Sequence, residues 1–431
     1  MNMNNKANDN HTIWKNHTYV KLFISYTIST MGSFFDMIAV MLLFSYVWQS
    51  EPWIIALIPV VYAFPHALFS QFAGIYVDKN NKVKIMLIAD ILTAVLTIIL
   101  FLISSPWMVL VILLIRSTCT IVHFPSQQAL IRKVVDPDLI TKAVTLNGAV
   151  NQLSKIIGPF LGASIATAFS PKIIFVVYVV ALLISACILL TLGNVDSQSD
   201  SNKNGSGEKV DSIWKTWREG WYLLFHTKVL FISFCFALIA FTAIQFVDAQ
   251  YAVLFREVYP NNPSVLGWAM SSAGLGALLI ILFLNRLQQV RKYGWYLGSS
   301  IVLIGCGFTI NGLLEVGFNI LWPIIASLIV GIGVGIFSVV HSYILQMESP
   351  KGKVGQMSGM YNSLTGIILL AAPITGGILV QWFNVFIIFQ VIGVTIVLIG
   401  VIGITLEKKL WKSETIHISS DHEELSQVDV G

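Results

Sequence analysis

Long apolar runs, separated by short polar turns, make up most of the chain. They lie at roughly 20–48, 53–77, 84–104, 107–131, 142–168, 172–193, 227–255, 264–288, 294–314, 320–347, 354–382 and 384–406. Each run is close to or above the roughly 20 residues that an α-helix needs to cross the hydrocarbon core of a bilayer. A membrane β-barrel would show short alternating segments instead of near-continuous Ile, Leu, Val and Phe. The pattern therefore predicts an all-α polytopic membrane protein with twelve transmembrane helices.

Polar stretches group the twelve runs into two sets of six. The stretch at 194–211 is rich in Ser, Asn, Gly and Asp, a composition typical of a flexible linker. We therefore expect an N-terminal tail, a six-helix bundle, a cytoplasmic linker, a second six-helix bundle and a C-terminal tail, at 1–17, 18–193, 194–226, 227–406 and 407–431.

The composition excludes a soluble protein. Of 431 residues, 56% are hydrophobic and only 11% are charged, whereas a soluble domain carries about 25% charged residues. The net charge of +4 is spread over short loops, so we expect no nucleic-acid partner. The four cysteines lie inside apolar runs, which favours small buried residues over disulfides or a metal site. We expect no metal and no cofactor.

The distribution of Lys and Arg predicts the orientation in the membrane. If the N-terminus is cytoplasmic, 22 of the 26 Lys and Arg residues fall on the cytoplasmic side, two on the external side and two within spans. Cytoplasmic loops of membrane proteins carry such an excess. We expect a multi-pass protein of the cell membrane with both termini in the cytoplasm. The Asn-, Ile- and Lys-rich composition favours a bacterium with an AT-rich genome.

The two halves of the chain carry matching residues. The fifth run contains Asn147 and Pro159, and the eleventh contains Asn362 and Pro373; each proline is followed three residues later by glycine. Runs one and seven each hold a single aspartate. A duplicated six-helix unit with both termini on one side is the plan of two-bundle transporters.

The turn between runs two and three contains Gly74, Asp78, Lys79 and Lys82. These residues fit the pattern G-x-x-x-D-[RK]-x-x-[RK], which resembles the loop between helices 2 and 3 of the major facilitator superfamily. Arg116 resembles the helix 4 arginine of that family.

A second motif lies in run five. Ser154, Gly158, Pro159 and Gly162, with Ala163, resemble the exporter signature g-x-x-x-G-P-x-x-G-G, although Ser154 and Ala163 replace two glycines. The resemblance covers about residues 20–406. It implies the major facilitator fold, and it is strongest to the macrolide-efflux-type branch of drug:proton antiporters. The helix 5 motif favours antiport over symport.

Four ionisable residues within spans are candidates for proton coupling or for the substrate cavity, because charge is costly inside a membrane. They are Asp36, Arg116, Lys155 and Asp248. Asp36 is expected to exchange a proton in a central cavity. The alternative is that its side chain only stabilises the packing of the helices. Asp248 is a second cavity carboxylate or a hydrated residue of an outer vestibule.

Arg116 stays charged even when it is buried, so it needs a carboxylate, carbonyl groups or water as a partner. The family resemblance implies that it sets the proton affinity of a nearby acid. Lys155 either pairs with Asp36 or Asp248 across the cavity or extends its amine to water.

The turn between runs two and three is expected to act as a conformational latch between the bundles, formed by Gly74, Asp78, Lys79 and Lys82. Asp90 is a candidate member of that network. The alternative is that the lysines only orient the loop. His66, His123 and His341 lie within spans without metal-ligand spacing; a proton relay through His123 is a less favoured alternative to a structural role.

The sequence predicts a transporter and not an enzyme. It contains no P-loop, G-x-S-x-G, H-E-x-x-H or paired C-x-x-C motif. The favoured function is export of an amphipathic small molecule, such as a macrolide-like drug, by proton antiport with alternating access. The expected partners are the substrate, protons and the lipid bilayer, and we expect a monomer. Alternatives are an exporter of a self-made metabolite such as a siderophore, an uptake symporter, a polytopic membrane enzyme and a non-transporting sensor.

Overall fold

The computed structural model describes residues 12–192, 221–222, 224–225, 227–284, 286, 292–350 and 353–411. Most of the expected N-terminal tail, linker and C-terminal tail lie outside these described residues.

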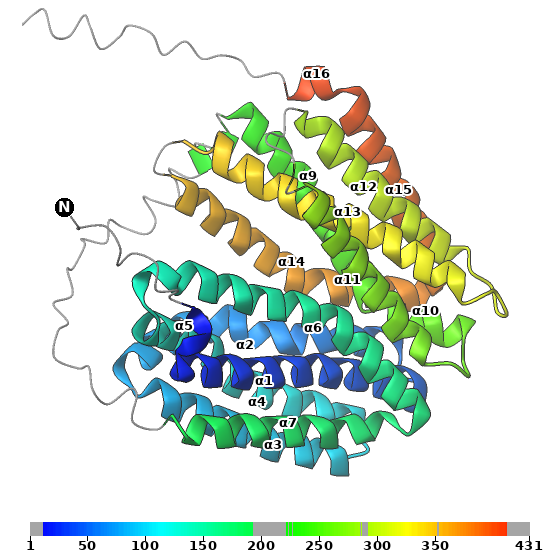
Figure 1. Cartoon of the computed structure of the whole chain (residues 1–431). Coiled ribbons are helices and arrows are strands. Elements are labelled where there is room, and N and C mark those ends of the chain that lie inside the picture. Colours follow the sequence, from blue (N-terminus) through cyan, green and yellow to red (C-terminus); the bar gives the residue numbers. More distant parts are fainter. Residues whose placement is uncertain are drawn as a thin grey trace, which may run out of the picture.

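The N-terminal half forms one bundle of helices (Figure 1). Its elements are η1 (Ile13–Lys15), α1 (His17–Leu42), η2 (Leu43–Val47), α2 (Pro52–Lys79), α3 (Lys82–Leu102), α4 (Pro106–Thr120), α5 (His123–Val134), η3 (Pro137–Leu139), α6 (Ile140–Ala168) and α7 (Pro171–Leu190). The π-helical η2 continues α1, and α4 and α5 together form one long span with a break at 121–122.

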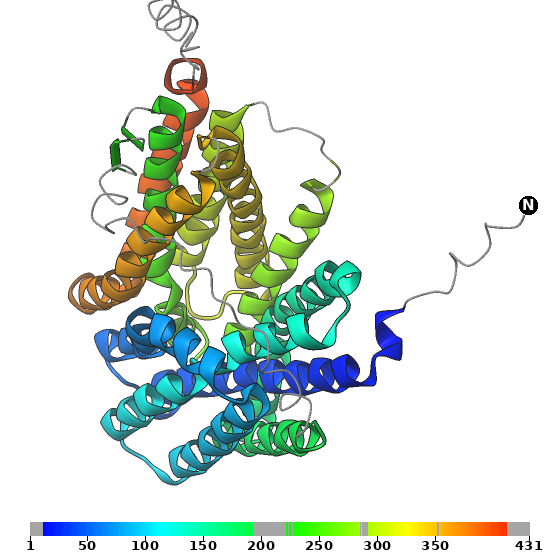
Figure 2. The same cartoon turned by 90° about the vertical axis from the view of Figure 1, so that its left-hand side faces the viewer.

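The C-terminal half forms a second bundle, drawn above the first in Figure 1. Its elements are α9 (Lys228–Asp248), α10 (Tyr251–Val258), α11 (Ser264–Leu284), α12 (Tyr293–Gly312), α13 (Leu321–Glu348), α14 (Val354–Phe383), α15 (Val385–Thr405) and the short α16 (Glu407–Leu410). After a turn of 90° the two bundles still lie one above the other (Figure 2).

Local sequence signals explain where the helices begin. Proline is the first residue of α2, α4 and α7, where its missing N–H and fixed φ cost nothing. Asn16 and Asn81 cap α1 and α3, because each side chain accepts a hydrogen bond from a backbone N–H of the first turn. These signals allow very short connections between long helices.

The predicted all-α architecture of two six-helix bundles is confirmed. Within the described ranges, eleven helical segments are long and apolar enough to span a membrane. The twelfth segment, α6, has 29 residues but is more polar, because Asn, Gln, Ser and Lys lie along its middle.

The two bundles meet through α6 with α11 and through α2 with α14. On the first seam, Ser264 Oγ donates to Thr167 Oγ1 at 2.6 Å and Ser271 Oγ donates to the Ile156 carbonyl at 2.6 Å. On the second seam, Gln381 Nε2 donates to Glu51 Oε2 at 3.2 Å. We call the end of the molecule where α2 begins and α6 ends the closed end, because the Ser264–Thr167 and Gln381–Glu51 contacts lie there.

The bundles diverge at the other end, which we call the open end, where α2 ends and α6 begins (Figure 1). Glycines show the contrast. A Cβ on Gly377, at the closed end, would lie 2.7 Å from Ala56 Cβ and 2.8 Å from Trp53 Cα. A Cβ on Gly74 or Gly148, toward the open end, would meet nothing within 4 Å. The molecule is therefore closed on one side and open on the other.

Candidate functional site

A central cavity of about 790 Å³ lies between the bundles. Helices α1 to α7 provide most of its wall, and α9 and α14 complete it from the other bundle. Its apolar lining includes Phe34, Met37, Met41 and Tyr62. Its carboxylate and basic lining residues are Asp36, Asp90, Asp248, Arg116, His66 and His123.

Asp36 and Arg116 form a buried ion pair in the wall of this cavity. The Asp36 residue is 2% exposed and Arg116 is 3% exposed. Arg116 Nη1 donates to Asp36 Oδ1 at 2.8 Å, and Nη2 donates to Oδ2. This two-point geometry joins α4 to α1 and gives the arginine the carboxylate partner that its permanent charge requires.

Three further side chains surround the pair. The Tyr62 hydroxyl accepts from Arg116 Nη2 at 2.8 Å and lies 3.2 Å from Asp36 Oδ2, to which it donates. Thr97 Oγ1 accepts from Arg116 Nη1 at 3.2 Å. The Arg116 guanidinium carbon also lies 5.8 Å from the centre of the Tyr178 ring, within the range of a cation–π contact. The arginine therefore has other partners if the Asp36 carboxylate loses its charge.

Sequence reasoning missed Tyr62, Thr97 and Tyr178. Aromatic and hydroxyl residues are common in apolar runs, so none of them carries a signal in one sequence. The helices bring them together: Tyr62 lies on α2, Thr97 on α3 and Tyr178 on α7.

Asp90 lies inside the N-terminal bundle, away from the expected latch. Its Oδ1 lies 3.3 Å from His123 Nε2, an ion-pair distance if His123 is protonated, although the alignment falls short of a hydrogen bond. Ser185 Oγ donates to Asp90 Oδ2 at 2.6 Å, and Ser25 Oγ lies 2.8 Å from Ser185 Oγ. The cluster places a second acid and base side by side in the wall of the same cavity.

Asp248 is the last residue of α9 and the acid that the C-terminal bundle contributes to the cavity. Its side chain is exposed to the cavity space. No Lys, Arg or His within the described ranges forms an ion pair with it, unlike Asp36 and Asp90.

Lys155 does not form the expected pair with Asp36 or Asp248. Its side chain is exposed, and its Nζ donates to Gln152 Oε1 at 3.1 Å on the same helix. The residue is not part of the cavity wall. Lys155 lies next to the small-residue face of α6 but is not part of it. Its amine can therefore extend away from the contact between α6 and α1.

The small residues of the α6 motif lie at helix crossings. Ser154, Gly158, Pro159 and Gly162 are all buried. A Cβ on Gly158 would lie 2.5 Å from Phe34 Cβ of α1, and a Cβ on Gly162 would lie 3.3 Å from Phe35 Cα. The motif therefore brings α6 close to the helix that carries Asp36.

The turn between α2 and α3 lies at the open end. Gly74 has free space around it, Asp78 and Lys79 are exposed, and Lys82 is half-buried. Lys82 Nζ donates to the Asn80 carbonyl at 3.1 Å and to the Asp78 carbonyl at 3.4 Å. These contacts stay within the turn.

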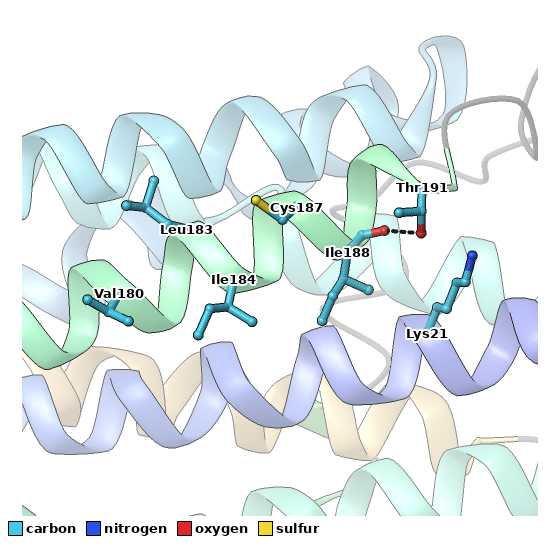
Figure 3. A pocket seen from close by; sticks show the side chains of 7 residues that line it. All are labelled: Lys21, Val180, Leu183, Ile184, Cys187, Ile188 and Thr191. Carbon is cyan, nitrogen blue, oxygen red and sulfur yellow. Dashed lines mark hydrogen bonds between the residues drawn. The ribbon is translucent and has the colours of Figure 1, made fainter.

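A second hollow of about 540 Å³ lies on the outer face between α1 and α7 (Figure 3). Apolar side chains line most of it, and Lys21 and Thr191 lie at one end. Cys187 is exposed in this hollow, and Cys119, Cys235 and Cys306 are half-buried, so the expectation of four buried cysteines is wrong at Cys187 and only partly met at the others. The hollow holds no carboxylate and is separate from the central cavity.

Two pseudo-symmetric helical bundles around a central cavity with buried charges define a secondary membrane transporter. The sequence profile of the Major Facilitator Superfamily matches residues 22–260 and 251–417. The chain belongs to this family and is a multi-pass membrane transporter, not an enzyme.

Relatives and solved structures agree with this assignment. The chain is 24% identical over 396 residues to the uncharacterized MFS-type transporter YfiS of Bacillus subtilis, across 91% of this chain and 93% of the relative. It is 26% identical over 321 residues to macrolide efflux protein A of Enterococcus faecalis, across 72% of this chain and 95% of the relative. The crystal structure of the nucleoside transporter NupG matches with a TM-score of 0.68 at 14% identity, across 92% of this chain and all of that chain.

Proposed function

We propose that the protein exports an amphipathic small molecule across the cytoplasmic membrane by proton antiport, acting as a monomer with alternating access. The observation that carries the proposal is the buried Asp36–Arg116 pair in the wall of the central cavity. A titratable carboxylate held at the substrate cavity lets one site respond to both proton and substrate.

The pair gives a physical route to coupling. Protonation of Asp36 removes the carboxylate charge but leaves the positive charge of Arg116 buried, because arginine does not release its proton. The Tyr62 hydroxyl, Thr97 and the Tyr178 ring then hold a charge without a full counter-ion. A buried charge without its partner is costly, so the protonated state favours a rearrangement of α1 and α4.

The proposed substrate class and the proposed direction of transport rest on different observations. The cavity wall combines aromatic, Met and carboxylate side chains, which suits an amphipathic molecule. Similarity to macrolide efflux protein A supports export and a macrolide-like drug. The small-residue motif on α6 adds support through its resemblance to exporters.

The open end is assigned to the cytoplasm, since the Lys-rich α2–α3 turn lies there. Both termini then lie in the cytoplasm, and the conformation is inward-open. Transport requires the bundles to separate at the closed end and meet at the open end.

The α2–α3 turn is proposed as a latch for that motion. The turn lies at the end where the bundles are apart, so its charged side chains approach the other bundle when that end closes. In this proposal Asp90 belongs to the cavity and not to the latch, because it contacts His123 and Ser185.

Efflux from energised cells tests the proposed function. Cells expressing the wild type should export a macrolide or a dye from a small panel, and a protonophore should stop this export. Asp36→Asn should fail at normal expression, whereas Lys155→Gln should export normally because Lys155 is outside the cavity. Export that survives both the protonophore and Asp36→Asn would overturn proton antiport. Uptake in place of export would favour the symporter alternative.

A further inference from the structure

The charges that line the central cavity do not balance. Three carboxylates, Asp36, Asp90 and Asp248, face one guanidinium, Arg116, and the two imidazoles of His66 and His123. Arg116 neutralises Asp36, and His123 lies beside Asp90. Asp248 remains without a positive partner within the described ranges.

The surroundings of Asp248 are those of a binding surface. It comes from α9, on the opposite bundle from the Asp36–Arg116 pair. The cavity wall it shares includes Met37, Met41 and Ile58 of the other bundle and Leu369 of α14. An exposed carboxylate beside apolar side chains offers one charge and a large contact surface to a single ligand.

Coulomb attraction gives this arrangement a preference for cationic ligands. A carboxylate in a confined, low-dielectric cavity attracts a cation more strongly than one in open water. The same carboxylate repels an anion. A neutral ligand of the same shape displaces water from the carboxylate and offers no opposite charge in return. The net negative lining therefore discriminates by the charge of the ligand.

We propose that Asp248 is the counter-ion for a lipophilic cation, such as a protonated amine on an apolar scaffold. Asp36 and Arg116 then serve proton coupling, and Asp248 determines the charge class of the substrate. The inference rests on the proposed function only in taking the central cavity as the substrate site.

Tetraphenylphosphonium and tetraphenylborate test this inference, because they share one shape and carry opposite charge. Binding is measured by equilibrium dialysis on the purified full-length protein in a neutral detergent, with protein-free micelles subtracted. The wild type should bind the phosphonium at least about tenfold more tightly than the borate, a difference of about 1.4 kcal/mol.

Three variants locate the effect. Asp248→Asn should lose most of the preference, and Asp248→Glu should retain it because the charge remains. Glu315→Gln removes one carboxylate in an exposed loop, outside the cavity, and should behave like the wild type. Monodisperse gel filtration shows that each variant is folded.

Equal binding of the two ions, no binding of either, or an unchanged preference in Asp248→Asn would overturn the inference. The assay needs no proton gradient and no transport direction. Charge-selective binding in a protein that fails the efflux test would leave the inference standing and reject the proposed function. Efflux in a protein that binds the two ions equally would support the proposed function and reject the inference about Asp248.

Discussion

Arg116 has a charge that it cannot lose, and its environment is built around that fact. It is nearly fully buried, and hydrogen bonds from its two terminal nitrogens reach Asp36, Tyr62 and Thr97. The sequence alone indicated that a mid-span arginine needs a carboxylate, carbonyl groups or water as its partner. It could not indicate which one, since Asp36, Lys155 and Asp248 offered several pairings and only the helix packing decides between them.

The pair predicts a specific pattern of stability. Arg116→Gln leaves the Asp36 carboxylate buried without its counter-charge, so it should lower the free energy of unfolding by about 3–5 kcal/mol. The double variant Asp36→Asn with Arg116→Gln removes both charges and should recover much of that loss. Thermal unfolding of the purified proteins in detergent measures the effect.

Lys155→Gln is the matched control for the loss of a cation within a span. It should change the free energy of unfolding by less than about 0.5 kcal/mol, because the Lys155 side chain is exposed and donates a hydrogen bond to its neighbour Gln152. A double variant as unstable as Arg116→Gln would contradict the ion-pair account.

At the scale of the helices, α6 is the element that joins the Asp36 helix to the other bundle. It packs on α1 through Gly158 and Gly162 and on α11 through Ala163 and Ile156. Its small residues were visible in the sequence, and so was their helical spacing. The second partner, α11, was not, because contacts between the bundles depend on the conformation of the whole transporter.

Gly267 of α11 provides the test of this seam. A Cβ there would overlap Ala163 Cβ and the Pro159 carbonyl of α6, so Gly267→Leu should force the closed end apart. A cysteine introduced at Ser264, which is buried against Thr167 in this seam, should then react faster with a membrane-impermeant thiol reagent added outside cells.

Gly148→Leu is the control. Gly148 lies on α6, the helix that Gly267 packs against, but a Cβ there would meet nothing within 4 Å. This variant should leave the labelling of the Ser264 cysteine unchanged. Equal labelling of Gly267→Leu and the wild type would show that this seam does not hold the closed end.

For the whole molecule, the hydrophobic pattern was sufficient to predict twelve helices in two bundles. The long apolar runs and the prolines at helix starts are local signals, so they can be recognised in a single sequence. The asymmetry between the closed and open ends was not predictable, since one sequence encodes both conformations of a transporter. The cluster of Asp90, His123 and Ser185 was missed for a related reason: its members come from three different helices.

Alternating access predicts that fixing the closed end stops transport. Glu51 and Gln381 contact each other across the bundles at 3.2 Å. With the four native cysteines replaced by serine, Glu51→Cys combined with Gln381→Cys should be joined by a short dithiol-reactive linker.

Transport by the linked protein should fall to background, and each single cysteine variant treated with the same linker should remain active. Substrate binding from the open end should persist in the linked protein. Full transport by the linked double variant would contradict a motion that separates the bundles at this end.

The most direct measurement of the central claim is proton movement in proteoliposomes, recorded with a pH-sensitive dye as substrate is added. The account predicts that substrate moving one way drives protons the other way in the wild type. It also predicts that Asp36→Asn still exchanges labelled for unlabelled substrate but moves no protons. Substrate-driven proton movement in Asp36→Asn equal to that of the wild type would contradict the assignment of Asp36 as the coupling residue.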